Sequence, residues 1–318
     1  MVGIEVQSSK YYNKKTKYII ISGIILVKLV LMGLFSSDYQ DKMFIPFVNT
    51  FLSGKNPYTY YYENQLLPSF PYLPLMLIVE SVGGFILFLL QPSSLFIRNL
   101  VFKIPLLAVD LIGYAVLRKM NIRFKYVIVF YFCSPIVLYS TYMHGQLDLI
   151  PTVFLLWSIY YVIRWNKKNN LLYFSLFFGF AISTKFHIVA AVPIVFFYIA
   201  SKKGCRTSLK YMLYSSFIPI IFCACFWGRG LIETVFLNKE QSVLLTVSFD
   251  YGTTQILIPI LALLIIYAKA FELNYFNKNL LFSILELLYA VFLICIPPMP
   301  AWYTWIVPFL ALYFGYIS

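Results

Sequence analysis

Three short polar segments of the sequence combine the residue types that carry out acid-base and phosphate chemistry. They are residues 37–41 (SDYQD), 144–148 (HGQLD) and 183–187 (STKFH), which hold three acids, a lysine and both histidines of the chain. A carboxylate can take the proton of an attacking hydroxyl, and an ammonium group can neutralise a phosphate. The three segments therefore predict an active site, provided that the fold brings them to one place.

The composition indicates what kind of fold must do this. Hydrophobic residues make up 61% of the 318 residues and charged residues only 12%, with a mean hydropathy of +0.80. Soluble domains carry about 25% charged residues, so we expect an all-α polytopic membrane protein. Aromatic residues reach 20%, which suits rings at the lipid interfaces. The five cysteines show no metal-ligand spacing and are interpreted as small apolar packing residues.

The hydropathy pattern predicts about ten crossings of the bilayer. A crossing needs about 20 apolar residues, or fewer where the helix is short or broken. No linker divides the sequence, so residues 1–318 are treated as a single domain. The predicted crossings are residues 19–36, 99–117, 124–142, 147–163, 171–183, 188–200, 211–227, 254–271, 279–296 and 303–317.

The net charge of +13 reports orientation and not nucleic-acid binding. Of 25 basic residues, 17 fall into five clusters, all of which become cytoplasmic if the chain starts inside. An excess of Lys and Arg in cytoplasmic loops is the positive-inside rule, so both termini are expected in the cytoplasm. The clusters lie within residues 10–17, 118–125, 164–168, 202–210 and 269–278.

One apolar segment, residues 72–90, does not fit this alternation. If it crossed fully, the basic loop at residues 118–125 would fall outside and every later loop would invert. Prolines near its start and the Gly83-Gly84 pair within it are compatible with a broken helix. We therefore expect a re-entrant or interfacial helix that stays at the outer face, after the first outer loop.

With this topology the three polar segments all emerge at the outer face. Lys185 and His187 occupy a hairpin between two predicted spans of only about a dozen residues. A turn at half depth is tolerated where it is buried in protein or lines a watery cavity. A cavity that opens outward at the membrane surface is the expected result.

At this point the sequence resembles the GT-C glycosyltransferases, and most of all the catalytic subunit of GPI mannosyltransferase I and its prokaryotic relatives. Residues 38–40 (DYQ), 56–58 (NPY) and 72–75 (YLPL) are similar to motifs of that family's first outer loop. Residues 98–110 resemble a span that is entered by a basic residue and carries an internal Asp. Residues 179–185 (GFAISTK) resemble its Gly-Phe-Ala-x-x-x-Lys turn.

The resemblance implies a GT-C-like fold and an inverting transfer of a sugar, mannose by analogy, from a polyprenyl-phosphate carrier such as dolichyl phosphate mannose. The acceptor would be a glycolipid, a polysaccharide or a protein. The family's Asp-x-Asp signature has Ser36 in place of its first Asp here, and a further acid follows at Asp41. Asp38 is thus the stronger candidate for the general base and Asp41 the weaker one. No metal site is assigned, and the need for a divalent cation stays open.

The other candidate residues follow from the same topology and resemblance. Arg98, Lys185 and Arg229 lie on the correct side to bind the donor phosphate. The residues expected to bind sugar hydroxyls or the acceptor are His144, Gln146, Asp148, His187 and Tyr303.

Each of these residues also has a plain structural explanation. An acid in an outer loop is usually solvated, a lysine near a helix end usually snorkels, and an acid such as Asp148 suits a helix N-terminus. The rings of Trp302, Tyr303 and Trp305 fit an aromatic belt better than a sugar platform. Ionisable residues within spans usually pair with one another, and we favour this for Lys28, Lys103, Asp110 and Glu286.

Two other classes of function stay open. A flippase or transporter for lipid-linked saccharides would also use intramembrane charges and broken helices. Against it, no internal repeat is visible and the polar residues gather at one face. A non-catalytic assembly subunit is the third class, and a helper subunit for the chain itself is compatible with the sequence. The expected location is the plasma membrane of a prokaryote or the ER membrane, with the site on the extracytoplasmic or lumenal side.

Overall fold

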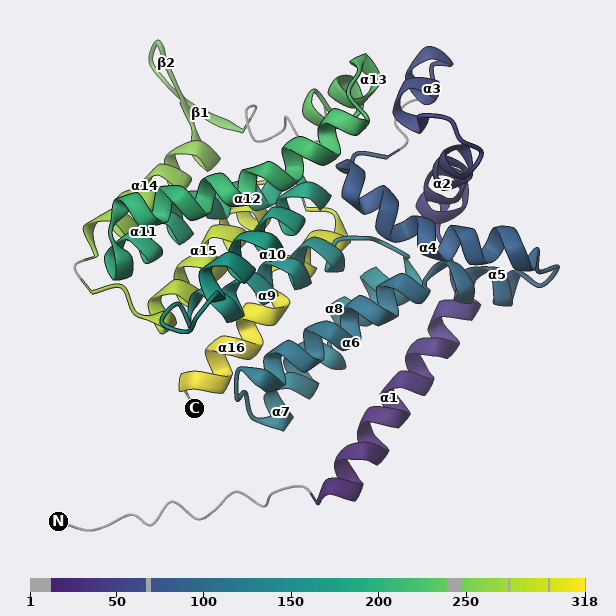
Figure 1. The fold of residues 1–318 in the computed structure, drawn as a ribbon, viewed down its shortest axis with the longest axis horizontal. Helices are drawn as coiled ribbons and strands as arrows, with labels where there is room; N and C mark the ends of the chain where they lie inside the picture. Colours follow the sequence, from purple (N-terminus) through teal and green to yellow (C-terminus); the bar gives the residue numbers. More distant parts are fainter. Residues whose placement is uncertain (1–12, 67–69, 239–246, 274, 297, 318) are drawn as a thin grey trace.

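The protein is described by a computed structural model, which covers residues 13–66, 70–238, 247–273, 275–296 and 298–317. Lys10 of the first basic cluster and residues 239–246, which follow Arg229, lie outside the described part. Within it the fold is helical apart from one two-stranded hairpin (Figure 1). The expectation of an all-α membrane protein is therefore confirmed at the level of fold class.

The elements are labelled α, β and, for helical turns wound more tightly or more loosely than an α-helix, η. The first half of the chain contains α1 (Lys14–Leu34), η1 (Tyr39–Phe44), α2 (Ile45–Leu52), α3 (Pro57–Glu63), α4 (Pro74–Leu90), α5 (Leu95–Phe102), α6 (Ile104–Lys119), α7 (Phe124–Val127), η2 (Ile128–Phe132), α8 (Pro135–Val137), η3 (Leu138–Met143) and α9 (Leu149–Val162).

The second half contains α10 (Asn170–Thr184), η4 (Phe186–Ala191), α11 (Val192–Lys203), α12 (Cys205–Cys225), α13 (Arg229–Leu231), η5 (Ile232–Phe236), β1 (Ser248–Tyr251), β2 (Thr254–Leu257), α14 (Ile258–Glu272), α15 (Lys278–Cys295), η7 (Pro300–Trp305) and α16 (Val307–Ile317). Strands β1 and β2 pair antiparallel, with Ser248 opposite Leu257.

Several helices are long and apolar enough to cross a bilayer. Five single helical runs of the described chain meet this criterion, and α5 with α6 makes a sixth if the pair, bent by 43°, is counted as one span. Helices α4, α9 and α10 are apolar but shorter, with 10 to 17 residues each. The structure thus contains helices that are long and apolar enough to span a membrane, while the total of ten crossings stays a prediction. The five runs are Lys14–Leu34, Phe124–Met143, Phe186–Lys203, Cys205–Cys225 and Lys278–Cys295.

Local sequence signals explain where several helices begin. The Asn13 side chain accepts a hydrogen bond from the Lys15 amide at the start of α1. The Asn56 side chain accepts from two amides at the start of α3, where Pro57 takes the first helical position. A side-chain acceptor followed by proline satisfies free N–H groups and presets the helical backbone. These signals fix the short helices of the first outer loop.

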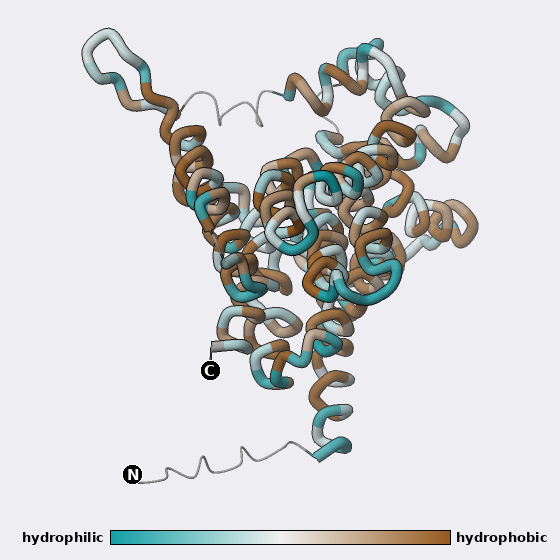
Figure 2. Tube along the Cα trace, turned by 60° about the vertical axis from the view of Figure 1, so that its left-hand side comes forward, coloured by the Kyte–Doolittle hydropathy of each residue, from teal (hydrophilic) through white to brown (hydrophobic). Residues whose placement is uncertain are grey.

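The two ends of the molecule along its vertical direction in Figure 1 contain different parts of the chain. The described N-terminal and C-terminal ends lie at the lower end, and α3, α13 and the β hairpin lie at the upper end (Figure 1). Figure 2, turned about the vertical axis, keeps these heights and shows hydrophobic residues along the helices and hydrophilic ones mainly at turns and chain ends. This is the distribution expected when helices lie in lipid and their ends in water.

Helix α4 begins and ends beside the ends of other helices. Just before it, the Leu73 amide donates to the Thr184 carbonyl at the end of α10, at 3.1 Å. Just after it, the Phe96 ring packs against Gly33 at the end of α1, so closely that a Cβ on Gly33 would overlap the ring. Helix α4 therefore connects the ends of α10 and α1, and its predicted re-entrant or interfacial placement stays a prediction.

An aromatic cluster holds the first outer loop against the body. The Phe47 ring stacks on Phe70 at 4.7 Å between centroids, and both Phe44 and Phe70 contact Tyr72 edge to face. The buried Tyr58 hydroxyl donates to the Tyr72 carbonyl at 2.7 Å. Aromatic pairs of this kind add stability beyond their buried area. The cluster therefore fixes Tyr72, which belongs to the site described next.

Candidate functional site

The centre of the site is an ion pair between Asp148 and Lys185. The Lys185 ammonium donates to Asp148 Oδ1, and the indole N–H of Trp305 donates to the same oxygen at 2.8 Å. Asp148 is 1% exposed and Lys185 8% exposed. The three residues come from the start of α9, the end of α10 and the turn η7, so the centre joins segments that are far apart in the chain.

Neither charged residue plays the plain structural role that its position suggests. Asp148 precedes the first residue of α9, but its side chain makes no capping hydrogen bond. Lys185 ends α10 with an extended backbone and is turned inward, whereas a snorkelling lysine would reach for the water interface. The fold thus directs both side chains toward each other and away from solvent.

Aromatic rings surround the ammonium of Lys185. Its Nζ lies 5.0 Å from the ring centroid of Tyr72, 5.3 Å from Trp305 and 5.9 Å from Trp302. The His187 imidazole stacks on Trp305 at 3.9 Å between centroids. Rings at these distances attract a cation electrostatically and keep water away from it. The charge of Lys185 is therefore held in a pocket of low polarity.

Two buried polar atoms in this centre have no hydrogen-bond partner within the described part of the chain. They are Asp148 Oδ2 and His187 Nδ1. Buried acceptors without partners are rare in folded proteins, and each one calls for a reason. A bound hydroxyl group would supply both the proton and the acceptor that these atoms lack.

A chain of polar contacts links the Asp148–Lys185 centre to the first outer loop. The Tyr72 hydroxyl contacts Gln146 Oε1 at 3.3 Å, and Gln146 Nε2 contacts His144 Nδ1 at 3.2 Å. The Ser37 hydroxyl then donates to the His144 carbonyl at 2.6 Å. The three polar segments singled out in the sequence are thus brought together by the fold.

The electrostatics of this chain keep its members neutral. Burial, and then the nearby Asp148 carboxylate, raise the pKa of Tyr72 well above its usual value. Burial, and then the charge of Lys103, lower the pKa of His144. Tyr72 therefore stays protonated and His144 stays uncharged near neutral pH. Both act as hydrogen-bonding groups and not as charges.

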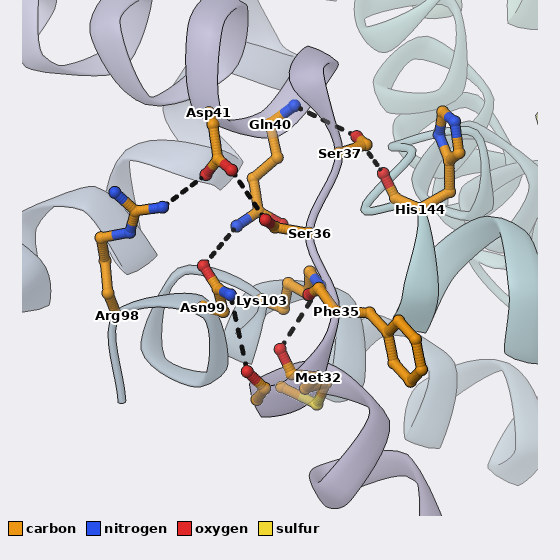
Figure 3. A network of polar contacts seen from close by, with 11 residues as sticks. Met32, Phe35, Ser36, Ser37, Gln40, Asp41, Arg98, Asn99, Lys103 and His144 are labelled. Carbon is orange, nitrogen blue, oxygen red and sulfur yellow. Dashed lines mark hydrogen bonds and ion pairs between the residues drawn. The ribbon is translucent and has the colours of Figure 1, made fainter. Parts of the chain in front are cut away.

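A second polar centre surrounds Asp41 (Figure 3). Arg98 donates to Asp41 Oδ1 at 2.7 Å, and the Ser36 hydroxyl donates to Oδ2 at 2.7 Å. Beneath them the Gln40 amide donates to Asn99 Oδ1 at 3.2 Å. This centre fixes η1 against α5. Arg98 is therefore engaged with an acid, although its Nε is buried and has no described partner.

Lys103 forms the floor of this region. Its side chain is fully buried, and its ammonium donates to the carbonyls of Met32 and Phe35 (Figure 3). It also donates to the carbonyl of Tyr142 at 3.0 Å. Free carbonyls end a helix with a partial negative charge, which a cation stabilises. Lys103 therefore joins the end of α1 to the end of η3. The expected pairing of Lys103 with another ionisable residue is not what the structure shows, because backbone carbonyls take that place.

Three of the predicted site residues lie apart from both centres. Asp38 is paired with Lys42 at 2.9 Å on the surface, with side-chain exposures of 80% and 72%. Arg229 is exposed at the start of α13, and Tyr303 is 39% exposed in η7. The structure thus gathers five predicted residues into one site, namely His144, Gln146, Asp148, Lys185 and His187. Asp38, Arg229 and Tyr303 lie outside this site.

An apolar groove is lined by chain neighbours of Tyr72 and Lys185. It has a volume of about 660 Å³ and is lined by Leu73, Ile182 and Phe186 on one side and by Ile220 and Trp227 on the other, among other apolar residues. Ile182 and Phe186 flank Lys185 in the chain. Phe186, Ile220 and Trp227 are 47%, 61% and 65% exposed, so the groove opens on the apolar surface of the molecule.

The acids, histidines and cysteines of the described residues do not form a metal-binding cluster. Within the described residues no three His, Cys, Asp or Glu side chains come close enough together to hold an ion. Asp38 and Asp41, the acids of the first outer loop, are each paired with a cation instead.

Three residues of the site were not identified from the sequence: Tyr72, Trp302 and Trp305. Tyr72 was visible only as part of a motif, and the two tryptophans were assigned to an aromatic belt. Their contribution depends on which rings the fold places against Lys185, which no local pattern encodes. A conspicuous feature was the run of proline and tryptophan at residues 298–305, typical of a rigid turn.

Comparison of the chain with protein-family models, with curated proteins and with solved structures finds no match. The similarity to GT-C enzymes therefore rests on the short motifs quoted above.

Proposed function

We propose that this protein is an integral-membrane glycosyltransferase of the GT-C kind. It moves a sugar, mannose by resemblance, from a polyprenyl-phosphate carrier to an acceptor on the extracytoplasmic side, with inversion at the anomeric carbon. The observation that carries the proposal is the apolar groove that is lined by chain neighbours of a buried lysine. A polyprenyl phosphate has the matching chemistry, since it joins a long apolar chain to an anionic head.

The groove suits the lipid part of such a donor. Its volume of about 660 Å³ falls within the range of small-molecule sites, and its walls are apolar. Because it opens on the lipid-facing surface, a carrier can enter from the bilayer without crossing water. The phosphate would then lie near Lys185, beside Ile182 and Phe186 of the groove.

The polar side of the site suits the sugar and the acceptor. The contacts from Ser37 through His144 and Gln146 to Tyr72 form a wall of hydrogen-bonding groups next to Lys185. The cationic side chain neutralises the charge that develops on the leaving phosphate, which is the usual protein contribution to such a displacement. Ten crossings, cytoplasmic termini and an outward-facing site complete the proposed topology.

The test is sugar transfer in liposomes that contain the purified protein, polyprenyl-phosphate mannose and a membrane extract as the source of the acceptor. Release of polyprenyl phosphate is followed by thin-layer chromatography, and flipping of the same lipid is followed in parallel by its accessibility to an added reagent. We expect release in the wild type and about a 10²- to 10³-fold slower rate in Lys185→Met, the loss typical for one preorganised electrostatic group.

Lys125→Met serves as the matched control, because Lys125 is exposed in a basic loop. Flipping without any release of polyprenyl phosphate would favour the flippase function and contradict the proposal. If the protein folds normally but shows neither sugar transfer nor lipid flipping, the result would favour an assembly subunit.

A further inference from the structure

The Asp148 carboxylate has one occupied and one free oxygen. Oδ1 receives both Lys185 and Trp305, whereas Oδ2 is buried and has no partner in the described residues. No other acid of the three polar segments has this character, because Asp38 is solvated beside Lys42 and Asp41 is bonded to Arg98 and Ser36. A free, desolvated carboxylate oxygen is what proton abstraction from a hydroxyl requires.

We infer that Asp148 is the general base of the transfer, and that the donor phosphate activates it by taking Lys185 away from it. The inference rests on the proposed function and departs from the resemblance, which points to Asp38. In the resting protein the ammonium neutralises the carboxylate. When the phosphate binds Lys185, Asp148 keeps the Trp305 N–H and the neighbouring Tyr72 hydroxyl but loses its cation. It then binds a proton more strongly, because a buried carboxylate without a cation is costly.

The chemical step then balances. The oxygen of the acceptor hydroxyl forms a bond to the anomeric carbon, while the bond from that carbon to the phosphate oxygen breaks. The electron pair of the broken bond leaves with the polyprenyl phosphate, whose negative charge rises by one and is neutralised by Lys185. The hydroxyl proton passes to Asp148 Oδ2. The order of binding follows, because the base becomes available only after the donor is in place.

The groups that face Asp148 set the conditions of the test. They are Lys185 and His187 from the segment after α10, Tyr72 from the segment before α4, and Trp305 from η7. Tyr72 stays protonated because its pKa is raised, so it does not titrate between pH 6 and 8. Asp148→Asn is nearly isosteric and leaves all four groups in place.

Binding is measured first, with a short-chain polyprenyl phosphate as the probe and the full-length protein in nanodiscs. Lys185→Met should lose binding. Asp148→Asn should bind the probe more tightly than the wild type, because the phosphate no longer competes with Asp148 for Lys185. A purely structural role of Asp148 predicts weaker binding instead. Wild-type affinity should also rise more steeply than that of Asp148→Asn as the pH falls from 8 to 6, since the released Asp148 becomes protonated in a fraction of the complexes. Only the complexes in which Asp148 stays ionised can turn over.

Turnover is measured next, as release of polyprenyl phosphate from polyprenyl-phosphate mannose. Asp148→Asn should be slower by about 10²- to 10⁴-fold, the typical contribution of a general base. Asp148→Glu should recover part of the rate. If Asp148→Asn binds the probe and turns over at the wild-type rate, the assignment is wrong while the proposed function stands. If the wild type neither binds nor turns over, the proposed function itself fails.

Should Asp148→Asn not fold, the wild type alone still decides the matter. Calorimetry of probe binding in two buffers with different heats of ionisation reports the protons taken up. Near pH 7.5 we expect the complex to take up more protons than the change in protonation of the phosphate alone accounts for. If the proton uptake equals the amount expected from the phosphate alone, the Asp148–Lys185 ion pair stays closed on binding and the inference is wrong.

Discussion

Lys28 of α1 and Asp110 of α6 form an ion pair that is fully excluded from solvent. The Tyr142 hydroxyl donates to the same Asp110 oxygen, and the Lys28 ammonium lies 3.5 Å from the centroid of the Phe132 ring. Ionisable residues within spans were expected to pair, and these two do. The pair connects α1, which makes few other buried contacts, to the body of the protein.

Removing one partner of this pair should destabilise the protein strongly. Lys28→Met leaves the Asp110 charge buried without a cation, which typically costs about 3–5 kcal/mol. The double variant Lys28→Met/Asp110→Asn should recover most of this loss, because no net charge remains buried. Thermal unfolding in detergent measures both, with the exposed Lys15→Met as the control. Equal instability of the single and double variants would contradict the account.

The proposed topology is tested by labelling of single cysteines in a background without the five native ones. Asn64, exposed after α3, should react as cysteine with an impermeant thiol reagent in intact cells. Asn169, exposed between α9 and α10, should react only after the membrane is opened. Labelling of both cysteines from the same side would mean that α4 crosses the bilayer, and the reverse result would mean that the orientation is inverted.

The acids of the first outer loop separate the resemblance from the geometry. If Asp148 is the base, Asp38→Asn should change turnover by no more than a few-fold, because an exposed ion pair of this kind contributes little. If the resemblance holds for this residue, the same variant should lose about 10²- to 10⁴-fold. Turnover of Asp38→Asn and Asp41→Asn, measured side by side, distinguishes the two hypotheses. A dead Asp41→Asn with an active Asp38→Asn would move the base to Asp41.

Arg98 is expected to matter for positioning more than for the phosphate. Its bond to Asp41 holds η1 against α5, and both side chains are about one-third exposed. Arg98→Ala should therefore lower stability only slightly and slow turnover less than Lys185→Met does. Measured rates decide this, with Arg98→Lys as a variant that keeps the charge. A loss in Arg98→Ala as large as that in Lys185→Met would place Arg98 at the phosphate as well.

The lowered pKa of His144 predicts an acid-sensitive fold. Since the folded protein holds this imidazole neutral while the unfolded chain protonates it near its usual pKa of about 6.5, stability should fall as the pH drops below that value. His144→Gln cannot be protonated, so this part of the pH dependence should disappear. Thermal unfolding between pH 7.5 and 5 measures the effect. An unchanged pH profile in the variant would contradict it.

The sequence was sufficient for the class of the protein and for the polar segments of the site. Composition and hydropathy predict a helical membrane protein directly, because a bilayer requires long apolar helices. The segments at residues 144–148 and 183–187 stood out because polar residues are rare in this chain, and the structure joins them through Asp148 and Lys185. Rarity, and not local periodicity, was the useful signal.

The sequence was not sufficient to rank the acids. Asp38 and Asp148 both lie at the boundary of an apolar helix, yet one is solvated and the other is buried. The difference arises from Lys185 and Trp305, which are 37 and 157 residues from Asp148 in the chain. Contacts over such separations depend on how helices pack against one another. Local sequence patterns do not predict this packing.

The position of Lys103 has a mechanical consequence. Its ammonium holds the last carbonyls of α1 and the carbonyl of Tyr142, so this end of α1 cannot move without moving the chain that leads to His144. A helix tilts when its apolar length exceeds the thickness of the surrounding bilayer. The 21-residue α1 is mostly lipid-exposed and will respond to that thickness. A change in membrane thickness is therefore expected to alter the hydrogen bonds of the site.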